Sequence, residues 1–72
     1  MSTIIDARGF SCPQPVLMTL YQIKKMDKGA IIVLVDTVTS RENVSRAAIA
    51  AGWTVSGIDT EGPEFRISIV RE

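Results

Sequence analysis

One segment of the chain, Cys12-Pro13-Gln14-Pro15, combines residue types that could carry out covalent chemistry. It holds the only cysteine, and the chain has no histidine. Because the usual base that activates a thiol is absent, Cys12 would have to react as a thiolate that is already formed. One cysteine without histidine also gives too few ligands for a zinc site, so we expect no metal and no cofactor.

The two prolines indicate where a helix begins, because proline is favoured at the first helical position. If Pro13 is first, Cys12 is the N-cap. If Pro15 is first, Gln14 is the cap and Cys12 lies just outside the helix. Extended geometry is preferred before a proline, which suits Cys12 in both registers and disfavours a helical Gln14. In both, the positive helix end can lower the thiol pKa from about 8.5 toward or below neutrality.

A lone cysteine is more often a small buried residue than a nucleophile. Here, however, Cys12 stands between a short loop at 8–11 and a helix that starts with proline. This position is at the end of an element, where side chains tend to be accessible. The local sequence therefore favours a reactive thiol, although the spacing alone does not identify the reaction.

The remaining segments alternate between strand-like and helix-like patterns, which predicts an α+β domain. We expect strands at 3–7, 30–35, 53–58 and 65–70, and helices at 15–28 and 39–51. The order βαβαββ, with a parallel first pair and a terminal antiparallel hairpin, predicts a two-layer α/β sandwich. Its mixed four-stranded sheet would carry both helices on one face, leaving the other face partly exposed. The whole chain, 1–72, is one domain.

Local signals define the first helix and the strand after it. Lys24, Lys25 and Lys28 suit the negative end of the first helix, and Gly29 supplies its stop. The continuous apolar run 30–35 predicts a central strand that is buried on both sides.

The second half of the chain has signals of its own. Thr39 and Glu42 fit a capping box that starts the second helix, which ends at Gly52. A narrow stripe of small residues would let this helix approach the sheet closely: Val44, Ala47, Ala48 and Ala51. Trp53 is expected in the core, and the strand alternation slips near Gly57, which suggests a bulge.

Composition narrows the classes of function. With 46% hydrophobic residues, 22% charged residues and zero net charge, the 72-residue chain has the composition of a soluble globular domain without an overall field toward nucleic acid or anionic membrane. No apolar run approaches the roughly 20 residues of a membrane span. The start of the chain lacks a secretory signal, so we expect a cytoplasmic protein.

The run from Asp6 to Val16 resembles the signature of the TusA/SirA-like family: Asp-x-x-Gly, a hydrophobic residue, any residue, then Cys-Pro-x-Pro. The resemblance covers nearly the whole chain and implies a βαβαββ domain whose Cys12 accepts sulfane sulfur as a persulfide and passes it on. It implies a donor such as a cysteine desulfurase or rhodanese-like protein, and a downstream acceptor protein. The chain would be a sulfurtransferase only in the sense of group transfer.

We expect other residues to assist Cys12. Four of them would shape the loop and helix that present it: Asp6, Gly9, Pro13 and Pro15. Three arginines could form a basic rim that steers an acidic partner: Arg8, Arg41 and Arg46.

Two alternatives remain open from the sequence. The segment 42–46 is similar to the YedF-like branch of the family, which is associated with selenium metabolism or has no settled role. A regulatory or RNA- or protein-binding module could instead use the open sheet face, with Cys12 incidental. Zero net charge and only four aromatic residues count against RNA.

Overall fold

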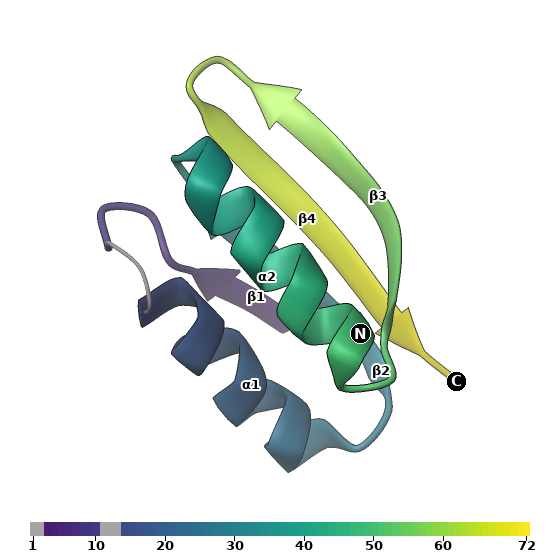
Figure 1. Cartoon of the computed structure of the whole chain (residues 1–72). Helices are drawn as coiled ribbons and strands as arrows, with labels where there is room; N and C mark the ends of the chain where they lie inside the picture. Colours follow the sequence, from purple (N-terminus) through teal and green to yellow (C-terminus); the bar gives the residue numbers. More distant parts are fainter. Residues whose placement is uncertain (1–2, 11–13) are drawn as a thin grey trace.

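The computed structural model describes residues 3–10 and 14–72. Its elements are β1 (Thr3–Asp6), α1 (Gln14–Met26), β2 (Gly29–Val35), α2 (Val38–Ala50), β3 (Thr54–Glu61) and β4 (Glu64–Arg71) (Figure 1). The predicted order βαβαββ is therefore confirmed. Neither helix in the described residues is long and apolar enough to cross a membrane.

The sheet is mixed, with the strand order β1-β2-β4-β3. β1 runs parallel to β2, so that Ile5 lies beside Val33, and α1 forms the crossover between them. β4 runs antiparallel to both of its neighbours, β2 and β3. The last strand in the sequence thus occupies a central position in the sheet.

Both helices pack on the same face of the sheet (Figure 1), which gives the predicted two-layer sandwich. Fully buried apolar side chains from the two central strands form the middle of the core: Ile31, Val33, Val35, Ile67 and Ile69. The helices contribute Ile23, Val44 and Ala48 to the same cluster. Burial of such side chains from water is the main term that stabilises the fold.

The opposite face of the sheet is open, which corrects the prediction that β2 is buried on both sides. Ile31 is fully buried, but its neighbours Ile32 and Leu34 are only half-buried. On the same open face Ile4 is 65% exposed. The reason is that the two helices cover one layer, and no described element covers the other.

Helix α1 ends two residues before the predicted boundary. Lys24 and Lys25 lie in its last turn, as predicted, but Lys28 lies beyond it. The residue directly after the helix, Asp27, has φ of 47°, and Gly29, which opens β2, has φ of 130°. An aspartate tolerates its conformation better than most residues do, whereas the conformation at Gly29 favours glycine.

Helix α2 begins earlier than the predicted capping box. Its N-cap is Thr37, whose hydroxyl accepts a hydrogen bond from the Ser40 amide at 3.0 Å. Thr39 lies inside the first turn, so the predicted Thr39–Glu42 box is wrong. Of the predicted small-residue stripe, Val44 and Ala48 are fully buried, whereas Ala47 and Ala51 are half-buried.

The C-terminal hairpin agrees more closely with its pattern. Trp53 precedes β3 and is 2% exposed, which confirms its place in the core. The β3–β4 register shifts between Val55 and Gly57, which confirms the predicted bulge. In β4, Ile67 and Ile69 are buried on the helix side, as the alternation predicted.

Candidate functional site

The candidate site lies where the carboxyl ends of β1 and β2 meet the N-terminal ends of both helices (Figure 1). This arrangement follows from the topology, because each of the two parallel strands is followed by a helix on the same face. Residues 7–10, which follow β1, lie at this end of the molecule (Figure 1). Cys12 and Pro13 lie outside the described residues, so the site is described from its two flanks.

The flank before Cys12 is a tight turn from Ala7 to Phe10. Ala7 is fully buried and its amide donates to the Leu34 carbonyl at 2.9 Å, which continues the pairing of β1 with β2. The Phe10 amide donates back to the Ala7 carbonyl at 3.4 Å. Gly9 has φ of +83°, a region that residues with a side chain rarely adopt. The loop therefore has a defined backbone up to Phe10.

Asp36, which directly follows β2, fixes this turn. Its carboxylate accepts a hydrogen bond from the Gly9 amide at 2.8 Å. Asp36 was not predicted to be part of the site, because the contact joins positions 27 residues apart. The available signal was the expected parallel pairing of the first two strands, which brings their carboxyl ends side by side.

Arg8 pairs with two carboxylates, one at the end of β1 and one at the start of β4. Its guanidinium makes two hydrogen bonds of 2.8 Å to the Asp6 carboxylate, and it lies 3.2 Å from Glu64 at the start of β4. Hydrogen bonds from the Arg8 side chain and then its backbone amide lower the pKa of Asp6 from 3.8 to about 2. The carboxylates of Asp6 and then Glu64 raise the pKa of Arg8. Glu64 is a second residue of the site that was not predicted from the sequence.

The three arginines expected to form a basic rim have different surroundings. Arg8 is paired with Asp6 and Glu64. Arg41 lies over the Phe65 ring, with its guanidinium 5.0 Å from the ring centroid. Arg46 is exposed on the next turn of α2, away from the direction of Arg41. Arg8 and Arg41 are both paired within the chain, since Arg41 also lies 3.7 Å from the Glu42 carboxylate, and the basic rim stays a prediction.

The flank after Cys12 is the first turn of α1. Gln14 is already helical, which disagrees with the register that made it the cap. The other register places the cap at Cys12, which lies outside the described residues. Pro15 is fully buried, and the Thr19 hydroxyl donates to its carbonyl at 2.9 Å. Pro15 thus anchors the start of the helix in the core.

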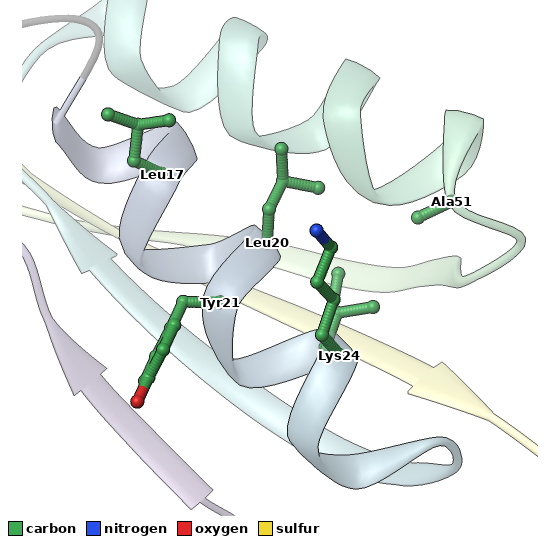
Figure 2. A pocket seen from close by; sticks show the side chains of 6 residues that line it. Leu17, Leu20, Tyr21, Lys24 and Ala51 are labelled. Carbon is green, nitrogen blue, oxygen red and sulfur yellow. The ribbon is translucent and has the colours of Figure 1, made fainter.

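An apolar groove of about 370 Å³ runs beside α1. Figure 2 shows Leu17 and Leu20 pointing from α1 toward α2, with Ala51 at the far end of α2. Tyr21 is 66% exposed, and the Lys25 ammonium lies 5.3 Å from the centroid of its ring. Leu17, which is 53% exposed, extends the groove to within two residues of the buried Pro15.

The sequence profile of the sulfurtransferase TusA family matches residues 3–71. The chain belongs to this family. The expected resemblance to TusA/SirA-like proteins is thereby confirmed.

Individual members of the family agree in sequence and in fold. The chain is 35% identical over 66 residues to YedF of Escherichia coli (strain K12), which is described as a candidate sulfur carrier; the match covers 90% of this chain and 86% of YedF. The same values hold for YedF of Salmonella typhimurium (strain LT2). The crystal structure of a SirA-like protein from Desulfitobacterium hafniense superimposes with a TM-score of 0.86 at 29% identity, covering 97% of this chain and 96% of the other.

Membership of the TusA family supports a sulfur-carrier role for the chain, which implies interactions with proteins that give and take sulfur. The geometry is compatible with such a role. A turn held by Asp36 and a helix start held by Pro15 bracket the only cysteine of the chain. Both helix N-termini, which carry partial positive charge, lie at the same end of the molecule (Figure 1).

Proposed function

We propose that Cys12 carries sulfane sulfur as a persulfide and relays it to an acceptor protein. The observation that carries this proposal is that a chain of the TusA sulfurtransferase family has a single thiol. No other side chain in the sequence can form a persulfide. Cys12 follows by three residues the Gly9 that Asp36 holds, and it precedes by two residues the first described residue of α1.

The proposed transfer has two steps of the same kind. The Cys12 thiolate attacks the outer sulfur of a donor persulfide, so that a new S–S bond forms at Cys12 and the donor leaves as a thiolate. An acceptor thiolate then attacks the outer sulfur on Cys12 and releases the Cys12 thiolate. Neither step changes the total number of S–S bonds, so no external oxidant or reductant is required.

Because the chain has no histidine to act as a base, the thiol of Cys12 must be ionised by its surroundings. The partial positive charge at the N-terminus of α1 favours the thiolate over the thiol. Gly9 and Pro15 hold the two flanks, and the Arg8–Asp6 pair stiffens the outer side of the loop. These are supporting roles, in which only Cys12 exchanges sulfur.

The donor in this proposal is a cysteine desulfurase or a rhodanese-like protein, and the acceptor is a protein with a free thiol. The chain has no second cysteine that could release the persulfide by forming an internal disulfide. A carrier that depends on a reduced thiol suits the reducing cytoplasm, which is where we place it.

Open-face RNA binding has less support. The aromatic residues among those described lie elsewhere: Trp53 is buried, Tyr21 is on α1, Phe10 is in the loop, and Phe65 packs on the helix side. The open face therefore lacks the aromatic side chains on which bases usually stack.

Intact-protein mass spectrometry tests the proposal. After incubation with a cysteine desulfurase and free cysteine, the wild-type chain should gain the mass of one sulfur atom, and a reductant should remove it. The Cys12→Ser variant, which retains the size of the side chain, should gain none. An unchanged wild-type mass, or an equal gain in the variant, would show that Cys12 is not the carrier.

A further inference from the structure

Asp36 lies between β2 and α2 and also contacts the loop after β1. It follows β2 directly and precedes Thr37, the N-cap of α2. Its side chain does not cap that helix in the described contacts; the Thr37 hydroxyl does. The Asp36 carboxylate instead accepts the Gly9 amide at 2.8 Å. It therefore ties the loop after β1 to the start of α2.

The loop between this contact and α1 is short. Four residues separate Gly9 from Gln14, and one residue spans at most about 3.6 Å. The Asp36 bond fixes the backbone at one end, and the buried Pro15 fixes the other. A shift of Gly9 would therefore be transmitted to the residues between, which include Cys12.

The other contact on the loop is less suited to set its position. The Arg8 side chain is 41% exposed and the Asp6 side chain 55%, so solvent and salt screen their attraction. Asp36 is half-buried, and its hydrogen bond to Gly9 is exposed, as those of Arg8 are. It differs in that its partner is a backbone amide, which has no side-chain torsions of its own.

We propose that Asp36 is a positioning residue, which holds the Gly9 amide and thereby keeps the thiol of Cys12 at the N-terminus of α1. This inference rests on the proposed role of Cys12. It assigns to Asp36 no contact with the transferred sulfur. What Asp36 contributes is an acceptor oxygen at a fixed place, and its negative charge is not required.

The test compares Asp36→Ala, which removes the acceptor, with Asp36→Asn, which removes the charge and keeps an acceptor oxygen. The readout is the rate of Cys12 alkylation by iodoacetamide as a function of pH, which gives the apparent pKa of the thiol. Loss of a nearby carboxylate charge alone would lower this pKa, because a negative charge opposes the thiolate. Loss of position should raise it, because the sulfur leaves the positive helix end.

We therefore expect Asp36→Ala to raise the apparent pKa of Cys12 by about one unit. At pH values below this pKa, alkylation should be about tenfold slower than in the wild type. Asp36→Asn should not raise it. Thr37→Ala serves as the control for stability, since it weakens the adjacent helix start without touching the Gly9 bond. Thr37→Ala should leave the apparent pKa of Cys12 unchanged, even if it lowers the thermal unfolding temperature as much as Asp36→Ala does.

Two results would overturn the inference: an apparent pKa that Asp36→Ala leaves unchanged or lowers, or an equal rise in Asp36→Asn. Alkylation needs no sulfur donor, so the assay is independent of persulfide loading. A wild-type chain that gains no sulfur would contradict the proposed function, whereas a loaded chain with a normal Asp36→Ala profile would contradict only the role of Asp36.

Discussion

Arg8 shows how the neighbours of a charged side chain decide what it can do. As a residue type it suits steering of an acidic partner, but two carboxylates already pair with it. One of them, Asp6, is the last residue of β1, and the other, Glu64, is the first residue of β4. The guanidinium therefore connects parts of this chain, and a partner would have to compete with both carboxylates for it.

The pairing of Arg8 with Asp6 predicts a dependence of stability on pH. The pKa of Asp6 is lowered from 3.8 to about 2 in the folded state. The pair therefore stabilises the fold fully above pH 3.8, and this stabilisation is lost as the pH falls through about 2. Asp6→Asn should lower the thermal unfolding temperature at neutral pH, and its difference from wild type should vanish near pH 2.

The measurement is thermal unfolding of both proteins at a series of pH values in low salt. Asp59→Asn is the matched control, since Asp59 is exposed and has no ion pair among the described residues. A difference between wild type and Asp6→Asn that stays constant from neutral pH to pH 2 would contradict the prediction.

At the scale of elements, α2 shows that a sequence pattern can predict the centre of a helix without predicting the residue at which the helix begins. Thr37, Thr39 and Ser40 are all residue types that cap helices, and the pattern Thr39-x-x-Glu42 satisfies the capping-box rule. The helix begins at the first of them because β2 ends at Val35 and the chain turns at once. The centre of the helix was predictable from its apolar spacing, whereas its first residue depends on the preceding strand.

The position of the cap gives a direct prediction. Thr37→Ala should lower the free energy of unfolding by about 1 kcal/mol, because it leaves a helix amide without its acceptor. Thr39→Ala should change it by less than about 0.5 kcal/mol, since Thr39 is exposed within the first turn. Urea denaturation of the two variants measures both values. A larger loss in Thr39→Ala than in Thr37→Ala would restore the capping box predicted from the sequence.

At the scale of the whole molecule, the sheet has one covered face and one open face, and this asymmetry decides which apolar residues stabilise the fold. Periodicity predicted the order of elements, the parallel first pair and the final hairpin. It did not give the position of β4 beside β2, because alternation describes the two faces of a strand and not its neighbours. The Gly9–Asp36 contact was not predicted for a related reason, since predicting it requires knowing how the ends of two strands lie relative to each other.

Two isoleucines test the asymmetry with the same substitution. Ile31→Val, in the covered layer, should cost about 1 kcal/mol of unfolding free energy, because it removes a methylene group from a fully buried side chain. Ile4→Val, on the open face, should cost less than about 0.5 kcal/mol. Urea denaturation distinguishes the two, and equal losses would indicate that the open face is buried in solution.

The central position of β4 has a consequence for how the protein is made. A ribosome delivers β1, α1, β2 and α2 first, but the strand that completes the pairing of β2 is the last of the six elements. Until residues 64–71 have emerged, Ile31 and Val33 lack the partners that β4 supplies, so the nascent chain has only half of its central sheet. Folding of this domain should therefore wait until β4 has been synthesised.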